Sequence, residues 1–219
     1  MLGKLLEAVI ARRLSFFAEA YGLLPDTQFG GRPGRTIEQV LLVLANAIDR
    51  AWYKQKAVTL VTFNLEGTFN GVNKTSLDAC LRTNGIPAVV RRWIASFMSD
   101  RQANIGSDDF QIEVAPLKNA GLVQGSSLSP ILFVFFNCDL VGQPVGFHGG
   151  ASAFIDHSFR WRVGWAAEEN FAKIQSEGIR IEAWAQRAGS CFAAKTVLIH
   201  LTRKKREQGK GQIIRSSNA

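Results

Sequence analysis

A glycine-rich basic loop at residues 28–35, which reads Gln-Phe-Gly-Gly-Arg-Pro-Gly-Arg, carries side chains well suited to bind an anion. The guanidinium groups of Arg32 and Arg35 can hold phosphate oxygens through paired hydrogen bonds. Thr36 follows as a predicted N-cap and Gln39 completes a capping box, so a helix N-terminus with exposed N–H groups lies beside the loop. The pattern is typical of phosphate binding, and an ordinary solvated turn is the alternative.

Cysteine and histidine side chains are too scattered along the chain to form a zinc site. They are Cys80, Cys138, Cys191, His148, His157 and His200. Because none has metal-type spacing, the cysteines are interpreted as buried free thiols in a reducing, intracellular compartment, either cytoplasm or nucleus. No apolar run approaches the roughly 18 residues of a membrane span, so no membrane partner is expected.

The balance of charge favours an anionic partner. The 219 residues include 26 lysines and arginines against 18 aspartates and glutamates, a formal net charge of +8. Nucleic acid is the partner that such an excess indicates first. Alternatively, part of the excess belongs to residues 204–219, which are expected to form a basic, disordered tail.

Helical and strand patterns are mixed, without the strict strand–helix–strand order of a parallel sheet. Helices are predicted at residues 4–22, 37–52, 74–83, 87–99, 129–140 and 167–187, and strands at 57–63, 151–155, 159–165 and 191–201, with a further hairpin at 102–115. Trp161, Trp165 and Trp184 are interpreted as core residues rather than platforms for stacking bases. This order of elements predicts a layered α+β fold.

Four segments carry a resemblance to one protein family, and they occur in that family's order. Residues 28–36 are similar to its fingers motif, and residues 61–72 to its first palm motif. Residues 121–133 are similar to a loop and helix that read G-x-P-Q-G-x-x-L-S-P, and residues 153–157 to a hairpin with two aspartates. Together, over residues 4 to about 203, the chain resembles a reverse transcriptase of the non-LTR, LINE-type retrotransposons.

The resemblance implies a right-hand polymerase core, with fingers at about 1–55 and a palm at about 56–203. The palm would hold an antiparallel sheet with helices on one face, and no thumb is recognisable. The implied activity is RNA-directed DNA synthesis, with an RNA template, a DNA primer and deoxynucleoside triphosphates as partners. Two Mg²⁺ ions would serve as cofactors.

By resemblance, the metal-ligand positions of the family correspond to Asn64, Asp156 and His157. Only Asp156 is acidic, whereas Mg²⁺ prefers oxygen ligands and imidazole nitrogen suits zinc or iron. We therefore expect Mg²⁺ to bind poorly. Glu66 could replace a lost ligand, since positions 64 and 66 of a continuing strand face the same side; the alternative is a polar residue outside the metal site.

By the same resemblance, the nucleotide- or template-binding residues are Phe69, Gln124, Gly125, Arg32, Arg35 and Lys195. Phe69 matches the aromatic residue beneath the incoming sugar, with a core phenylalanine as the alternative. Gly125 allows the backbone to approach the template closely. Val123 and Ser126 stand where the family commonly has proline.

Three functional hypotheses remain open from the sequence. The chain is a truncated retrotransposon segment with impaired polymerase chemistry, a surviving RNA-directed DNA polymerase in which Asp156 and Glu66 suffice, or a non-enzymatic domain that binds nucleic acid. Primer extension would separate the second hypothesis from the others, and salt-dependent RNA binding would separate the third from the first.

Overall fold

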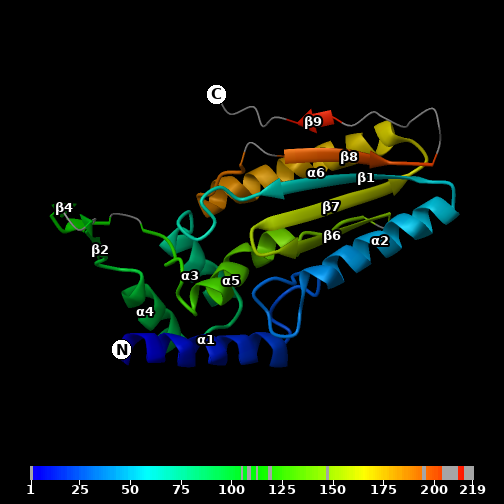
Figure 1. Cartoon of the computed structure of the whole chain (residues 1–219). Helices are drawn as coiled ribbons and strands as arrows, with labels where there is room; N and C mark the ends of the chain where they lie inside the picture. Colours follow the sequence, from blue (N-terminus) through cyan, green and yellow to red (C-terminus); the bar gives the residue numbers. More distant parts are fainter. Residues whose placement is uncertain are drawn as a thin grey trace.

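An antiparallel five-stranded sheet forms the centre of the structure, which is a computed structural model (Figure 1). Its strand order is β6-β7-β1-β8-β9, with bounds Gly149–Phe154, His157–Gly164, Ala57–Asn64, Thr196–Leu201 and Gln212–Ile214. All neighbouring strands pair antiparallel, which confirms the predicted α+β class. The structure describes residues 2–104, 106–107, 110–111, 113–117, 120–146, 148–193, 196–203 and 212–214.

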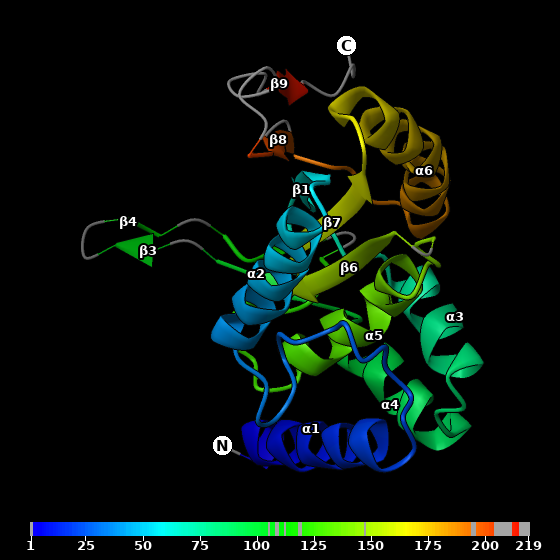
Figure 2. The ribbon, with the colours of Figure 1, turned by 90° about the vertical axis from the view of Figure 1, so that its right-hand side faces the viewer.

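Side chains of β7 alternate between the two faces of the sheet, as the pleat of a strand requires. On one face Trp161 packs against α2 (Ile37–Tyr53). On the other face Arg162 forms an ion pair with Glu177 of α6 (Ala167–Ala188). Figure 2 shows α2 and α6 on opposite sides of β1 and β7. The sheet therefore separates two environments, and helices contact both of its faces.

Helix α5 (Ser129–Val141) lies at the centre of the main hydrophobic core. Phe133 and Phe135 are fully buried, and Phe136 packs edge-on against Trp184 of α6 with ring centroids 5.8 Å apart. Such burial on all sides explains why the helix is apolar around its whole circumference. Among the described residues, no helix has both the length and the apolar character needed to cross a membrane.

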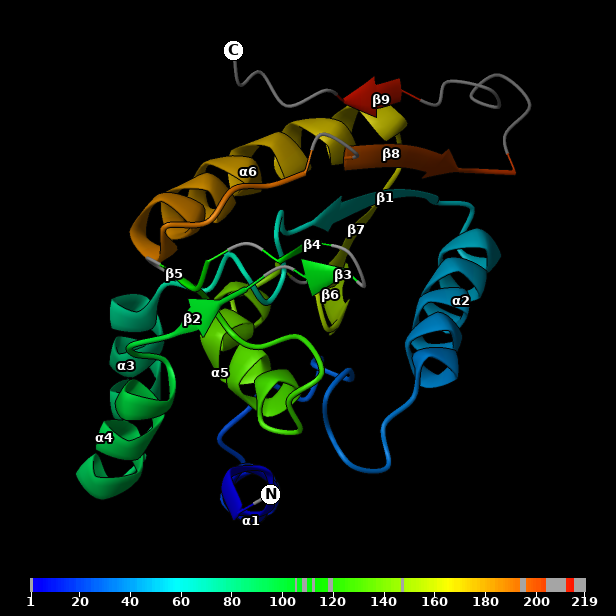
Figure 3. The same cartoon turned by 60° about the vertical axis from the view of Figure 1, so that its left-hand side comes forward.

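Three further helices gather around α5 on the side away from β8 (Figure 3). They are α1 (Leu2–Ala20), α3 (Lys74–Thr83) and α4 (Ala88–Phe97). Between α4 and α5, two short strand pairs extend away from the body of the molecule (Figure 2). In one pair β2 (Gln102–Ala103) lies antiparallel to β5 (Ala115–Pro116), and in the other β3 (Gly106–Ser107) lies antiparallel to β4 (Phe110–Gln111). This pairing agrees with the predicted hairpin.

Most predicted elements agree with the structure to within a few residues. The capping box before α2 is present, since the backbone N–H of Thr36 donates to Gln39 Oε1 at 3.0 Å. The last predicted strand is shorter than expected: β8 begins at Thr196, and Phe192 contacts the end of β1 through an isolated bridge to Leu65.

One segment of the predicted tail, residues 212–214, lies in the described part of the chain. These residues form β9 and pair with Thr196–Leu198 of β8. The physical reason is that an edge strand presents free N–H and C=O groups that recruit another strand. Residues 204–211 and 215–219 of the tail lie outside the described part of the chain.

The cysteines agree with the prediction of free thiols, but one of them is not buried. Burial raises the pKa of Cys138 to about 12 and that of the half-buried Cys80 to about 11. Cys191 is exposed, so the prediction of a buried thiol is wrong there. The reason is its position just after α6, where only its carbonyl is engaged, by the backbone N–H of Glu66 at 2.9 Å.

We expect Phe133→Ala to lower the free energy of unfolding by about 3–5 kcal/mol, because it leaves a cavity beside α5. Phe16→Ala on α1 is a matched control, since Phe16 is 67% exposed and its loss should cost no more than about 0.5 kcal/mol. Urea unfolding of both variants measures the difference. Equal losses in the two variants would contradict the central position of α5.

Candidate functional site

The ends of β1 and β7 bring together the three positions predicted as metal ligands. Asn64 and His157 are register partners in the antiparallel pair, and His157 Nδ1 lies 3.2 Å from Asn64 Oδ1. This contact is a hydrogen bond in the tautomer with its proton on Nδ1. Asp156 occupies the adjoining turn, and its Oδ1 lies 3.9 Å from His157 Nδ1. Residues 92 positions apart in the chain thus converge on one point.

The only carboxylate among these three side chains is itself engaged. Thr68 Oγ1 donates a hydrogen bond to Asp156 Oδ2 at 2.9 Å. Glu66 is exposed, and it makes no side-chain hydrogen bond or ion pair to any residue that the structure describes. Within the described residues, no group of three or more histidine, cysteine, aspartate or glutamate side chains could hold a metal ion.

The turn that carries Asp156 has a strained backbone. Ile155 adopts φ = 54°, which is rare for a β-branched residue and costs on the order of 1–3 kcal/mol. Two hydrogen bonds support the turn: Asn137 Nδ2 donates to the carbonyl of Ile155 at 2.9 Å, and the N–H of Leu65 donates to the carbonyl of Asp156 at 3.4 Å. The surrounding structure therefore fixes where the Asp156 carboxylate lies.

The glycine-rich loop supports the same turn from another side. The N–H of Phe29 donates to the carbonyl of Ala153 at 2.9 Å, and the N–H of Ala153 donates to Thr27 at 2.9 Å. A Cβ added at Gly30 would lie 2.3 Å from the backbone nitrogen of Ile155, which leaves room only for glycine. The fingers motif thus packs directly on the hairpin that bears Asp156.

The two arginines of this loop differ in their surroundings. Arg32 is 7% exposed, and it binds Glu19 through Nε at 2.7 Å and Nη2 at 2.8 Å, while Nη1 donates to the carbonyls of Pro25 and Gln28. The hydrogen bond from Arg32 lowers the pKa of Glu19. All three guanidinium nitrogens of Arg32 therefore donate to groups within the fold, so this side chain stabilises the loop.

Arg35 is the more accessible of the two arginines. Its Nη1 donates to the carbonyl of Asp26 at 2.6 Å, and its Nη2 forms an exposed ion pair with the Asp26 carboxylate at 3.3 Å. Its guanidinium also lies over the ring of Phe29, 5.5 Å from the centroid. Exposed pairs of this kind exchange readily with solvent and other anions. Arg35 can therefore contact a phosphate, whereas Arg32 is enclosed.

The loop before α5 meets the loop after β1 at Phe69. The N–H of Leu122 donates to the carbonyl of Phe69 at 2.7 Å, and a Cβ at Gly121 would lie 2.3 Å from that oxygen. Phe69 is half-buried, with its ring edge-on to Phe133 at 5.6 Å. Phe69 thus packs against the main core as a partly buried residue, and its role in nucleotide binding stays a prediction.

Gln124 and Gly125 form the exposed tip of this loop. Gly125 has φ = +86°, a conformation that favours glycine. Ser126, in place of a family proline, donates through Oγ to Glu7 Oε2 of α1 at 2.6 Å and accepts from the N–H of Leu128. The loop is thereby tied to α1. Lys195 lies outside the described residues.

Three supporting residues escaped the sequence analysis: Glu7, Thr68 and Asn137. Asn137 had a visible signal, because it is a polar residue inside an otherwise apolar helix and is fully buried. Glu7 had none, since it looks like any charged residue on a solvated helix and its partner Ser126 lies 119 positions away.

The sequence family described as "Reverse transcriptase (RNA-dependent DNA polymerase)" matches residues 1–145. A "Reverse transcriptase-like protein" of Chlamydomonas reinhardtii is 31% identical over 121 residues, which are 54% of this chain and 30% of that protein. A Drosophila melanogaster protein, "Probable RNA-directed DNA polymerase from transposon X-element", is 26% identical over 194 residues, or 85% of this chain and 20% of that protein. The chain thus spans less than a third of the length of these curated relatives.

Solved structures share the fold at low sequence identity. Apo telomerase from Candida tropicalis, truncated from its C-terminal domain, matches with a TM-score of 0.63 and 12% identity, covering 90% of this chain and 40% of that chain. Telomerase from Candida albicans with a telomeric RNA fragment gives a TM-score of 0.63 at 12% identity, covering 90% and 34%. With the family matching well over half of its residues, the chain belongs to the reverse transcriptase (RNA-dependent DNA polymerase) family.

Proposed function

We propose that this chain is the fingers-and-palm part of a reverse transcriptase of a non-LTR retrotransposon, with a catalytic centre impaired in metal binding. Fingers correspond to about residues 1–55 and the palm to about 56–203. The observation that carries the proposal is the hydrogen-bonded contact between Asn64 and His157 at the ends of β1 and β7. The similarity to transposon-encoded polymerases supports the assignment.

The donor set at this position does not fit a two-magnesium site. Such a site holds its ions roughly 3.5–4 Å apart and needs several carboxylate oxygens. Here Asp156 supplies one formal negative charge, Asn64 supplies a neutral amide oxygen already facing His157, and the imidazole supplies nitrogen. A protonated His157 would repel a cation. The electrostatic contribution that is usually largest in catalysis is therefore weakened.

A residual polymerase is the second candidate, and one observation favours it. Glu66 is exposed two residues beyond Asn64, in the turn that follows β1. Its carboxylate is not engaged by any described residue, so it is available to replace a lost ligand. Against this, Leu65 pairs with Phe192 and the N–H of Glu66 donates to Cys191, which fixes the backbone that Glu66 would have to move.

Surfaces for nucleic acid remain beside the altered centre. Gln124 and Gly125 are exposed at the tip of their loop, and Arg35 is the accessible cation of the fingers loop. The net charge of +8 supports attraction to a polyanion. We therefore propose an RNA template paired with a DNA primer as the partner, and deoxynucleoside triphosphates as the inherited substrates.

The first test restores the acidic positions through Asn64→Asp and His157→Asp, separately and together. We expect the double variant to bind Mn²⁺, a spectroscopic substitute for Mg²⁺, at least about 10-fold more tightly than the unchanged chain, since each added carboxylate supplies an anionic oxygen ligand. Electron paramagnetic resonance of free Mn²⁺ measures the change. Asn46→Asp with His148→Asp is the matched control, because it makes the same chemical changes at exposed positions away from the site.

In a fusion to the thumb of a related active enzyme, primer extension should be at least about 10²-fold faster with both residues restored than without. Comparable synthesis by the unrestored fusion would refute the impaired centre. A further Glu66→Gln substitution would then show whether Glu66 acts as the substitute ligand.

A second prediction concerns binding of an RNA–DNA duplex. We expect an affinity in the micromolar range or weaker, and Arg35→Gln should reduce the slope of log K against log salt by about one, because one phosphate contact is lost. Arg82→Gln on α3 is the control, since Arg82 is exposed and lies outside the loop. Fluorescence anisotropy between about 50 and 200 mM salt measures both slopes. Identical slopes for the two variants would remove Arg35 from the binding surface.

A further inference from the structure

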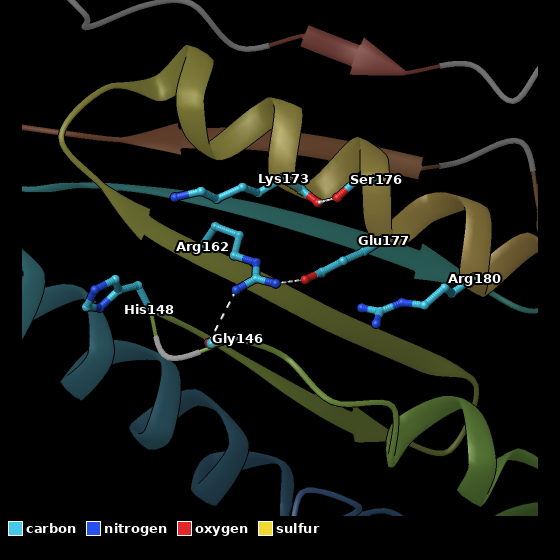
Figure 4. A pocket seen from close by; sticks show the side chains of 7 residues that line it. All are labelled: Gly146, His148, Arg162, Lys173, Ser176, Glu177 and Arg180. Atoms are coloured by element: carbon cyan, nitrogen blue, oxygen red, sulfur yellow. Dashed lines mark hydrogen bonds and ion pairs between the residues drawn. The ribbon is translucent and has the colours of Figure 1, made fainter.

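A pocket of about 530 Å³ lies between α6 and the β6–β7 hairpin (Figure 4). Arg162 lines it from β7, and Glu177 and Arg180 line it from α6. Arg162 is five residues along β7 from His157, or about 17 Å at the rise of an antiparallel strand. Because positions 157 and 162 differ by an odd number, the two side chains face opposite sides of the sheet. The pocket is thus separate from the site at Asn64.

Two arginines on this face of β7 are buried without full use of their donors, and one of them, Arg162, lines the pocket. Arg160 is 2% exposed and Arg162 is 9% exposed. Arg160 Nη2 donates to the carbonyl of Leu140 at 2.6 Å, and Arg162 Nη1 donates to Gly146 at 3.2 Å. Arg160 Nη1 and Arg162 Nε are buried and have no hydrogen-bond partner in the part of the chain that the structure describes. Such buried donors are uncommon and call for an acceptor.

Positive charge exceeds negative charge around these donors. Glu177 forms an ion pair with Arg162 and offsets one guanidinium. Lys173 at the rim is matched by Glu169 at 2.5 Å. Arg160 and Arg180 remain without a carboxylate on the described residues, although Arg180 Nη2 donates to the carbonyl of Pro144 at 3.3 Å. The local excess is therefore two positive charges.

The mutual repulsion of these cations is visible in their acid–base behaviour. Burial, followed by the charges of Arg180 and Arg162, lowers the pKa of Arg160 to about 10. Burial and then the charge of Arg180 lower the pKa of Arg162. Arg160 therefore stays charged near pH 7, and a bound anion would relieve both its desolvation and the repulsion from its neighbours.

We propose that this pocket binds the terminal phosphate of a small molecule, between Arg162 and Arg180. Guanidinium forks match phosphate oxygens in paired, charge-assisted hydrogen bonds. In Figure 4 the guanidiniums of Arg162 and Arg180 flank the Glu177 carboxylate in the pocket. Inorganic pyrophosphate and a nucleoside triphosphate both carry the required group. The proposal goes beyond the polymerase assignment and does not depend on metal at Asp156.

Thermal unfolding of the whole chain tests the pocket, in EDTA and at constant ionic strength adjusted with NaCl. Pyrophosphate and dATP are titrated separately, and each ligand that binds the native state raises Tm by mass action. Stabilisation by both ligands identifies a general phosphate site. Stabilisation by only one ligand shows whether the bound phosphate comes from pyrophosphate or from a nucleoside triphosphate. No rise with either ligand would overturn the proposal, as would a rise only with a short RNA, which would mark a nucleic-acid surface instead.

Three variants locate the site. Arg180→Gln should weaken the apparent affinity at least about 10-fold, because it removes a cation that is exposed and not part of the core. Arg187→Gln is the matched control on the same helix, and it should leave the affinity unchanged. Glu177→Gln should strengthen binding, since it removes the carboxylate that competes for Arg162. Equal affinity in Arg180→Gln and Arg187→Gln would overturn the assignment.

Discussion

The antiparallel pairing of β1 with β7 is the constraint on which the rest of the site depends. Its register runs from Ala57 opposite Gly164 to Asn64 opposite His157. A slip of one residue would move every side chain of one strand to the other face, so the buried positions of β1, such as Val61 and Phe63, hold the register in place. The meeting of Asn64 and His157 is thus a consequence of core packing rather than of their own attraction.

The same reasoning explains why the scaffold does not depend on the side chains at positions 64 and 157. The turn at Ile155 is held by backbone groups and by Asn137, and the loop at Gly30 approaches it through backbone atoms. None of these contacts uses the side chain at position 64 or 157. A carboxylate placed at either position would therefore change the charge of the site with little effect on the fold, whereas metal chemistry depends on that charge directly.

Periodicity was enough to predict most elements, because it follows from local pattern, and the resemblance to the family implied that Asn64, Asp156 and His157 belong to one site. The enclosure of Arg32 could not be predicted, since it depends on Glu19 from α1 and on carbonyls that only the folded loop presents. The pairing of β9 likewise depends on the free edge of β8, which the composition of a basic tail does not indicate. Both features depend on tertiary contacts between segments far apart in the chain, which the local pattern at either segment does not indicate.

Stability alone does not account for the two arginines on the helix-covered side of β7. Burying a charge is costly, and apolar residues of similar volume at such positions are often neutral or stabilising. Arg160 and Arg162 are nevertheless only 2% and 9% exposed. Of these two arginines, Arg162 forms an ion pair with a described carboxylate, that of Glu177. The alternation of β7 places His157 on the opposite face, so the candidate site at Asn64 does not explain them either. What remains is an interaction with an anion that the fold itself does not supply.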